Sequence, residues 1–269
     1  MDFYGLFGEK LGHSLSPEIH NTFFKICNIE GAYKLFEVEK ENLKDAVLGL
    51  KALKIKGANV TIPYKVEIMK YLDFISDEAK KIKAVNTVCL KDGKLYGYNT
   101  DYFGFSDIIR KNNIDIDKKT AMVLGNGGAC KAVITYLLDN NIEKVYLISR
   151  RKNTENDFDD NRVILKTYDE ISDIKGKVLI NTTPVGMYPN CGKSVVDEDI
   201  IRNFDVLIDI VYNPAETEFL KIGKKLNKKV YGGMTMLIGQ AIKSEEIWQE
   251  KEFSDSYVEN LYKKFKDRF

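Results

Sequence analysis

Histidine and cysteine are scarce in this sequence. Its 269 residues include two histidines, His13 and His20, and four cysteines that lie far apart and form no C-x-x-C pair. Two histidines leave little material for a histidine metal site or a Ser-His-Asp triad, and the cysteine spacing predicts neither a zinc site nor a disulfide framework. Scattered reduced thiols are typical of the cytosol, so we expect a cytoplasmic protein that binds no metal.

An excess of charge of one sign and a long apolar run are also missing. The chain has 41 Lys and Arg residues against 40 Asp and Glu residues, which gives a net charge of +1. This balance gives no reason to expect binding to nucleic acid or to an anionic membrane. No apolar run approaches the roughly 20 residues that cross a bilayer, and the first residues lack the basic and apolar regions of a signal peptide. We therefore expect no nucleic acid and no membrane among the partners.

Strand-like and helix-like segments alternate through the first hundred residues, which predicts an α/β fold with a mostly parallel sheet. Ser16 is expected to be the N-cap of the first helix, with Pro17 at its first position. Strands are expected at 3–8, 33–39 and 57–64, helices at 16–28, 41–53 and 65–82, and a hairpin over 84–99 that turns at Asp92-Gly93.

The pattern restarts at residue 101, which indicates a second, doubly wound unit. We expect the amphipathic helices that end the chain to pack back onto the first domain. The predicted domains are therefore residues 1–100 plus 236–269, and residues 101–235. In the second domain we expect a helix at 101–113, a strand, glycine turn and helix over 119–141, and strands at 144–151, 161–168, 177–184 and 205–212.

The segment "VLGNGGA" (123–129) is typical of a dinucleotide-binding turn, because it follows a buried-looking strand and opens a helix. Gly125, Gly127 and Gly128 would let a pyrophosphate approach the N–H groups of the helix N-terminus. The spacing is G-x-G-G-A and not the usual G-x-G-x-x-G, so a tight strand–helix turn is the simpler alternative. The surrounding strand–helix–strand pattern favours the cofactor.

The end of the next strand indicates which nicotinamide cofactor is used. NAD enzymes usually carry an acid there, which holds the ribose 2′-hydroxyl. This chain has Ser149, Arg150, Arg151 and Lys152 instead. Guanidinium and ammonium groups suit a 2′-phosphate, so NADP is favoured over NAD. A solvated basic loop is the alternative reading, and it fits Lys152 better than the two arginines.

Two features of the first domain point to an anionic substrate. In "GHSLSP" (12–17), an extended Ser14-Leu15-Ser16 places both hydroxyls on one side, next to a helix N-terminus that favours an anion. In "NVTIPYK" (59–65), Pro63 must end the strand, and Lys65 follows it. This lysine is either an ordinary surface residue or an ammonium group directed into the site.

Short polar clusters follow other strands of the first domain. They contain Asn86, Asn99, Thr100 and Asp101. Asp101 alone could be an N-cap, but open α/β sheets place their ligands where such clusters meet, at strand ends.

Taken together, these segments resemble the shikimate dehydrogenase family over the whole chain. Each motif is weak alone, but eight in the right order are highly specific. They are "HSLSP" (13–17), "NVTIPYK" (59–65), "AVNTV" (84–88), "NTDYFG" (99–104), "GNGGACKA" (125–132), "INTTPVGMYP" (180–189), "DIVYNP" (209–214) and "MLIGQA" (236–241).

The resemblance implies an N-terminal substrate domain, a Rossmann-like NADP domain and a terminal helix that returns to the first domain. It implies that Lys65 and Asp101 are the catalytic pair in the reversible reduction of 3-dehydroshikimate by NADPH, in the shikimate pathway to chorismate and the aromatic amino acids. The residues implied to hold shikimate are Ser14, Ser16, Thr61, Asn86, Asp101, Tyr212 and Gln240. Those implied to contact the cofactor are Asp77, Gly125, Asn126, Gly127, Gly128, Ala129, Ser149, Arg150, Arg151, Ile210 and Gly233.

Some residues depart from the family pattern. Ser149-Arg150-Arg151 stands where Asn-Arg-Thr is usual, Asn126 replaces a common alanine, and Thr235 stands where many relatives have glycine. Arg150 keeps the central guanidinium, so NADP is still favoured.

The role of Asp101 has two alternatives at this stage. It could orient Lys65 and the substrate hydroxyls, or share a proton with Lys65 so that the pair titrates together. The sequence gives no oligomeric state, and a monomer and a homodimer both fit.

Three other functions are alternatives. An NAD-using quinate/shikimate dehydrogenase would need an acid where the arginines stand. A methylene-tetrahydrofolate dehydrogenase would leave the Ser-x-Ser-Pro and Asn-Thr-Asp clusters unexplained. A non-catalytic NADP or shikimate sensor would need neither Lys65 nor Asp101.

Overall fold

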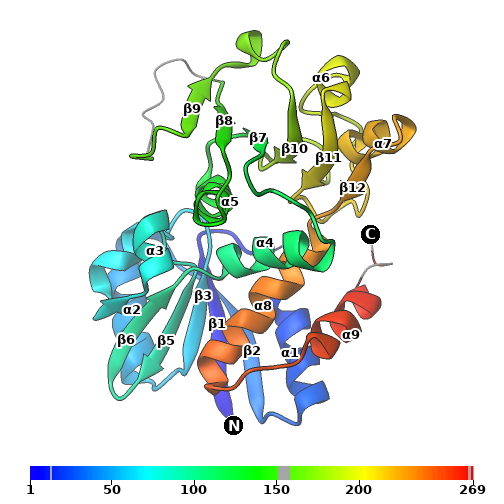
Figure 1. Cartoon of the computed structure of the whole chain (residues 1–269). Helices are drawn as coiled ribbons and strands as arrows, with labels where there is room; N and C mark the ends of the chain where they lie inside the picture. Colours follow the sequence, from blue (N-terminus) through cyan, green and yellow to red (C-terminus); the bar gives the residue numbers. More distant parts are fainter. Residues whose placement is uncertain (13, 151–157, 266–267, 269) are drawn as a thin grey trace. The chain divides into compact units, whose positions relative to one another are not determined.

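The chain forms two compact units, each with its own sheet. Unit 1 consists of Met1–Gly104 and Ile238–Leu261, and unit 2 of Phe105–Leu237 and Tyr262–Phe269. The computed structural model describes every residue except 13, 151–157, 266–267 and 269 (Figure 1).

The sheet of unit 1 has six strands in the order β2-β1-β3-β5-β6-β4. β1, β2 and β3 run parallel, β5 and β6 form an antiparallel hairpin, and β4 is parallel to β6. The hairpin turns where the sequence predicts it, because Asp92 and Gly93 both have positive φ angles. The strands are β1 (Asp2–Gly8), β2 (Gly31–Glu37), β3 (Gly57–Val60), β4 (Phe74–Ile75), β5 (Thr87–Lys91) and β6 (Lys94–Tyr98).

Helices cover both faces of this sheet (Figure 1). On one face, the Tyr4 ring packs against Phe24 of α1 and Trp248 of α8, at centroid distances of 5.3 and 4.9 Å. On the other face, Leu50 of α2 and Ala79 of α3 join the core that contains Phe7. The helices are α1 (Ser16–Cys27), α2 (Leu43–Ala52), α3 (Asp77–Ile82), α8 (Met234–Gln249) and α9 (Asp255–Phe265), with 3-10 turns at Lys40–Asn42 and Glu67–Tyr71.

The helix expected over 65–82 is wrong. The segment forms the 3-10 turn Glu67–Tyr71, the short strand β4 and then α3. Phe74 and Ile75 pair with Tyr96 and Gly97, and the Leu95 N–H donates to Asp73 Oδ2 at 2.7 Å. Pairing with a strand 22 residues further along the chain overrides the helical periodicity of this segment, and a local pattern cannot show such pairing.

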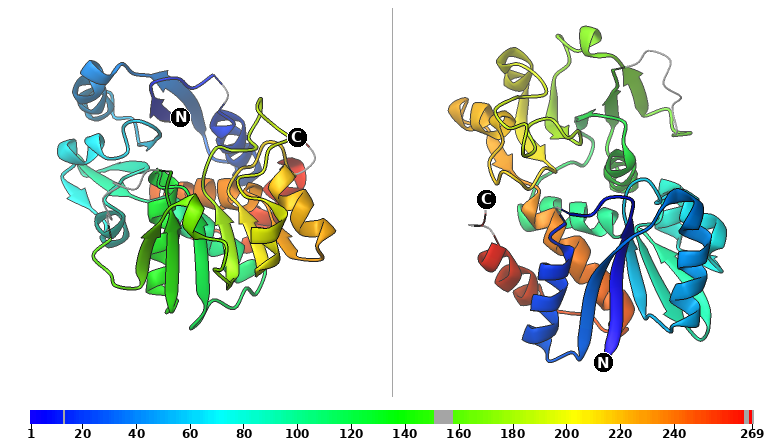
Figure 2. Two further views of the ribbon diagram at one scale, coloured as in Figure 1. Left: turned by 90° about the horizontal axis from the view of Figure 1, so that it is seen from above. Right: turned by 180° about the vertical axis from the view of Figure 1, so that it is seen from behind.

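The sheet of unit 2 is fully parallel, with the order β12-β11-β10-β7-β8-β9. Its strands lie side by side in the left view of Figure 2. The order reverses at β7, and open sheets of this kind bind ligands at the carboxyl ends of the strands near such a point. The strands are β7 (Thr120–Leu124), β8 (Lys144–Ile148), β9 (Val163–Lys166), β10 (Gly176–Asn181), β11 (Phe204–Asp209) and β12 (Lys229–Tyr231).

One face of the second sheet packs against α6 and α7, where Ile201 and Phe219 join a core with Leu124 and Leu179. The remaining helical elements are α4 (Thr100–Lys111), α5 (Gly128–Asp139), α6 (Glu198–Arg202), α7 (Glu218–Lys225) and the 3-10 turn Tyr168–Glu170. Within the described residues, no helix has the length and apolar character needed to cross a membrane, and no three His, Cys, Asp or Glu side chains gather as a metal site would require.

Gly57 provides a test of the unit 1 core. A Cβ atom at this position would lie 2.0 Å from Nε1 of Trp248, whereas a Cβ at Gly49 in α2 would meet nothing within 4 Å. We expect Gly57→Ala to destabilise the protein by roughly 1–3 kcal/mol through overpacking. Gly49→Ala should stabilise it by roughly 0.5–1 kcal/mol, because alanine is the better helix former. Trp248 is the only tryptophan, so its fluorescence during urea unfolding measures both variants, and equal stabilities would contradict the packing described here.

Candidate active site

Lys65 and Asp101 form an ion pair in unit 1. Nζ of Lys65 lies 2.7 Å from Oδ2 of Asp101, and the two side chains are 18% and 9% exposed. Lys65 stands in the turn that follows β3, and Asp101 stands in the first turn of α4. The pair is thus shielded from water but still reachable, which suits acid–base chemistry.

The segment Val85–Asn86 links the two members of this pair. The Val85 N–H donates to the Lys65 carbonyl oxygen at 2.7 Å. The Asn86 Oδ1 accepts a 2.7 Å hydrogen bond from the backbone N–H of Thr100, the residue before Asp101. Asn86 is itself buried, and its backbone bonds to Val60 and Tyr98. The position of each member of the pair therefore depends on the same dipeptide.

The hydroxyls of Ser14 and Ser16 lie together, as expected. Ser14 Oγ donates to Ser16 Oγ at 3.2 Å, and the Ser16 N–H donates to Ser14 Oγ at 3.2 Å. The N-cap assignment is wrong, because Leu15 precedes α1 with helical dihedral angles and Ser16 lies inside the first turn. The Ser16 hydroxyl is therefore engaged with Ser14 and makes no capping hydrogen bond.

Thr61 and Gln240 also lie in unit 1. The Thr61 N–H donates to the Phe7 carbonyl oxygen, which places Thr61 directly after β3. The Gln240 carbonyl oxygen accepts a 3.0 Å bond from the Ser244 hydroxyl, and both residues are on α8.

A buried polar network beneath these residues was missed by the sequence reasoning. It contains Tyr33, Asn59, Thr87 and Ser244, which come from four different elements. Asn59 is the first residue of "NVTIPYK" (59–65), but nothing in the sequence pairs it with Tyr33 or Ser244. Only the tertiary fold brings them together.

In unit 2, the glycine turn after β7 has the geometry that an anion needs. Gly125 has a φ angle of +101°, which favours glycine, and a Cβ there would lie 2.7 Å from Thr183 Cγ2. Gly127 and Gly128 face open space, and Ala129 lies in the first turn of α5, which contains no acidic residue. The Gly125 N–H donates to the Ile148 carbonyl oxygen, whereas the first N–H groups of α5 have no partner within the helix and suit a phosphate. The Asn126 Oδ1 is buried and has no partner among the described residues.

The basic segment after β8 is only partly described. Ser149 is buried, and its N–H donates to the Lys166 carbonyl oxygen at 3.0 Å. Arg150 is exposed and lowers the pKa of Tyr168 against the larger effect of burial, which raises that pKa. Arg151 lies outside the described residues.

Ile210 and Gly233 approach each other closely. A Cβ at Gly233 would lie 2.1 Å from the Ile210 carbonyl oxygen, so only glycine fits there. Tyr212 follows on the same loop, and burial raises the pKa of its phenol. These three residues belong to unit 2, as do the glycine turn and Arg150.

Asp77, the remaining expected cofactor residue, lies at the start of α3 in unit 1. Its side chain is 94% exposed and pairs with Lys80 at 3.3 Å. Among the described contacts, none ties Asp77 to another residue expected at the cofactor site.

Asp209 is a buried carboxylate at the end of β11 that the sequence reasoning did not single out. Its Oδ1 accepts hydrogen bonds of 3.0 Å from Asn181 Nδ2 and from the Val211 N–H, and its Oδ2 accepts one of 2.6 Å from Thr217. Burial raises its pKa to about 6, against the opposing effect of these three donors. Asp209 thus joins the last residue of β10 to the loop that follows β11, and this loop carries Ile210 and Tyr212.

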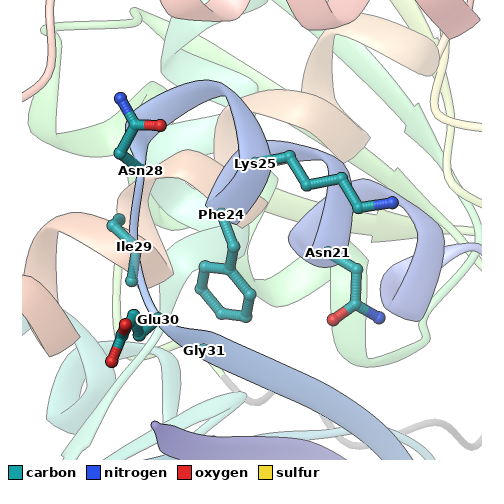
Figure 3. Close-up of a pocket in the computed structure, with 7 residues that line it drawn as sticks. All are labelled: Asn21, Phe24, Lys25, Asn28, Ile29, Glu30 and Gly31. Carbon is teal, nitrogen blue, oxygen red and sulfur yellow. The ribbon is translucent and has the colours of Figure 1, made fainter.

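An open hollow of about 790 Å³ lies at the C-terminal end of α1 (Figure 3). Asn21, Phe24 and Lys25 of α1 and the turn over residues 28–31 line it. It includes none of the residues expected to bind shikimate or NADP. The amide of Asn21 is used to hold Tyr33, because its Oδ1 accepts from the Tyr33 N–H and its Nδ2 donates to the Tyr33 carbonyl oxygen.

Comparisons with known proteins agree on one family. Residues 6–88 match the model of the shikimate dehydrogenase substrate binding domain. The chain is 64% identical to the shikimate dehydrogenase (NADP(+)) of Clostridium beijerinckii, with all of both chains covered. It is 52% identical to the crystal structure of shikimate dehydrogenase 1 from Peptoclostridium difficile, with 100% and 99% of the chains covered and a TM-score of 0.92. It is 35% identical to a shikimate dehydrogenase crystallised with NADP+, with 98% and 95% covered and a TM-score of 0.86.

The raised pKa of Asp209 predicts how stability depends on pH. The folded protein holds this proton more tightly than the unfolded chain, where the pKa is near 3.8. Protonation of Asp209 therefore contributes fully to the free energy of unfolding below about pH 4. This contribution is lost as the pH rises through 6, a change of roughly 3 kcal/mol. The side chain that Asp209→Asn introduces is neutral at every pH, so the variant should lack this loss. As the pH rises from 4 to 7, the difference in unfolding free energy between the variant and the wild type should therefore shift in favour of the variant.

Urea unfolding at a series of pH values measures the difference. Asp205→Asn removes an exposed carboxylate from the same strand and is the control for loss of a charge. Parallel stability curves for Asp209→Asn and the wild type would show that Asp209 does not hold its proton more tightly in the folded protein.

Proposed function

The chain belongs to the shikimate dehydrogenase family, and we propose on this basis that it catalyses the reversible reduction of 3-dehydroshikimate to shikimate with NADPH. The 64% identity to a shikimate dehydrogenase (NADP(+)) over the full length supports this activity. The proposed activity is a step of the shikimate pathway, which leads to chorismate and the aromatic amino acids.

Lys65 and Asp101 are the proposed catalytic pair, and their 2.7 Å ion pair is the observation that carries the proposal. When NADPH is bound it supplies the hydride. The chain must then manage one proton at the 3-oxygen of the substrate, where reduction develops negative charge. The Lys65 ammonium stabilises that charge and donates the proton, while Asp101 holds the ammonium in place.

Polar side chains of unit 1 are proposed to hold the rest of the substrate. Shikimate carries a carboxylate and hydroxyls, and a site of matched donors and acceptors rejects analogues that lack them. The adjacent Ser14 and Ser16 hydroxyls at the start of α1 are suited to the carboxylate. The full set implied by the family resemblance is Ser14, Ser16, Thr61, Asn86, Asp101, Tyr212 and Gln240.

Unit 2 is proposed to hold NADP. The open face of Gly127 and Gly128 at the start of α5 fits a pyrophosphate, and the exposed Arg150 guanidinium fits a 2′-phosphate. The unpartnered Asn126 Oδ1 is an acceptor suited to a ribose hydroxyl. Ala129, Ser149, Ile210 and Gly233 complete the set on this unit, with Arg151 and the exposed Asp77 as further members implied by the family resemblance.

The proposed domain roles follow from this division. Residues 1–100 plus 236–269 would form the substrate domain and residues 101–235 the NADP domain. The match of residues 6–88 to a substrate binding domain supports the first assignment. We further propose that the enzyme is cytoplasmic, because its four cysteines are free thiols. We propose that it binds no nucleic acid, because its net charge is +1. A monomer and a homodimer are both compatible with this function.

A spectrophotometric assay of the purified protein tests the function. NADP+ is compared with NAD+, and shikimate with quinate, while the other component is held constant. We expect turnover that strongly favours NADP+ and shikimate. Equal or better turnover with NAD+ or quinate would indicate the broader quinate/shikimate dehydrogenase. Tight binding of shikimate without turnover would indicate a sensor.

The role of Lys65 gives a separate prediction. Lys65→Ala removes the proton donor, so kcat should fall by roughly 100-fold or more while KM for shikimate rises far less. Lys70→Ala is the matched control, because Lys70 is an exposed lysine in the neighbouring turn and pairs with Glu67. A Lys65→Ala enzyme with near-normal kcat would remove Lys65 from the chemistry.

A further inference from the structure

We propose that Asn59 is a positioning residue for this reaction, which acts through the Thr87 hydroxyl to support the orientation of the Asn86 amide in which its NH2 group faces the substrate. This inference rests on the proposed function, because it assigns Asn86 to the shikimate site. It concerns a side chain that is itself fully engaged by the protein.

Asn59 lies on β3 and its side chain has partners on every side. Its Oδ1 accepts a 2.7 Å bond from the hydroxyl of Tyr33 on β2. Its Nδ2 donates to Thr87 Oγ1 on β5 at 3.0 Å and to Ser244 Oγ on α8 at 2.9 Å, and it also lies 3.4 Å from the Asn86 carbonyl oxygen. Both hydrogens of the amide are thus used, which leaves the amide a single orientation.

The orientation of the Asn59 amide also affects which hydroxyl groups can donate to Asn86. The Thr87 hydroxyl accepts from Asn59, so its own hydrogen is available to Asn86 Oδ1 at 3.1 Å. The Ser244 hydroxyl likewise accepts from Asn59 and donates to the Gln240 carbonyl oxygen. Asn59 therefore leaves the Thr87 hydroxyl as a donor, and Asn86 Oδ1, Thr100 Oγ1 and Ser244 Oγ all lie 3.1 Å from it as acceptors. Asn86 Oδ1 is the one of the three that can only accept.

Three donors converge on Asn86 Oδ1. They are the Thr87 hydroxyl, the Thr100 hydroxyl at 3.2 Å and the Thr100 backbone N–H at 2.7 Å. A flipped amide would place its NH2 group against all three, including an N–H that cannot turn away. The Asn86 Nδ2, which makes no hydrogen bond to the described residues, is left to donate to a substrate oxygen. Asn86 thus selects an oxygen that can accept.

The far side of the network is held by stacking. The Tyr33 ring stacks on the ring of His20 with centroids 4.2 Å apart and planes 1° apart, and His20 Nδ1 lies 2.6 Å from Glu245 Oε1. Glu245 and Ser244 are neighbours on α8 and both are buried. One helix therefore fixes both Asn59 and the aromatic ring that donates to it. Burial raises the pKa of the Tyr33 phenol well above its ordinary value, so the donor keeps its proton.

Asn59→Asp tests the proposal with almost no change in shape. The new carboxylate can still accept from Tyr33, but it cannot donate, so Thr87 must turn its hydrogen away from Asn86. We expect KM and the calorimetric Kd for shikimate to rise about fivefold to tenfold, as for the loss of one hydrogen bond, with KM for NADP+ unchanged. Thr87→Val removes the hydroxyl that lies between Asn59 Nδ2 and Asn86 Oδ1, together with its contacts to Thr100 and Ser244, and should give a rise of similar size.

The decisive measurement repeats both substitutions on an Asn86→Ala background. If Asn59 acts through Asn86, neither Asn59→Asp nor Thr87→Val weakens shikimate binding further there, because coupled residues are not additive. An equal penalty on both backgrounds, or no penalty on the wild-type background, would overturn the proposal. Asn21→Asp is the matched control, since it disturbs Tyr33 through its backbone alone and should lower stability without changing the Kd for shikimate.

The wild-type assay keeps this test separate from the proposed function. A wild-type protein that neither oxidises nor binds shikimate would contradict the function itself. An active wild type with additive penalties would contradict only the role of Asn59.

Discussion

The 2.7 Å contact between Lys65 and Asp101 depends on two hydrogen bonds made by neighbouring residues. Val85 binds the backbone of Lys65, and the Asn86 side chain binds the backbone N–H of Thr100. A mostly buried ion pair pays a desolvation cost and adds little net stability. Its geometry must therefore be imposed by the surrounding backbone, and here a dipeptide ahead of β5 imposes it.

Other buried polar groups of the chain also have to be held in place by hydrogen bonds. Each must find a partner, because an unsatisfied group inside the protein costs more than a hydrogen bond contributes. In unit 1 a chain of hydrogen bonds runs from Asn86 through Thr87 to Asn59 and Tyr33. The ring of Tyr33 in turn stacks on the ring of His20. In unit 2, Asn181, Val211 and Thr217 each donate a hydrogen bond to the buried carboxylate of Asp209. Polar satisfaction, and not only apolar packing, therefore shapes the loops that carry function.

Local signals in the sequence were enough for much of this arrangement. Glycines, a proline and strand periodicity predict β3, the hairpin at Asp92-Gly93 and the turn before α5, because each depends on residues close in the chain. The sequence could not show that 74–75 form a strand, since their partners lie on β6. It could not show the cap geometry of Ser16, which depends on the dihedral angles of Leu15. Nor could it show Tyr33 or Ser244, because their partners are 26 and 185 residues away.

The two units hold their functional residues by separate means, and this separation has a physical consequence. The hydrogen bonds that fix Lys65, Asn86 and Asp101 all lie within unit 1, and those that fix the loop of Ile210 and Tyr212 lie within unit 2. Substitutions in independent networks are expected to add, whereas those within one network are not. The loop held by Asp209 carries both Ile210, proposed for NADP, and Tyr212, proposed for shikimate. A substitution in the unit 2 network is therefore expected to weaken the binding of both proposed ligands, whereas one in the unit 1 network is expected to weaken the binding of shikimate alone.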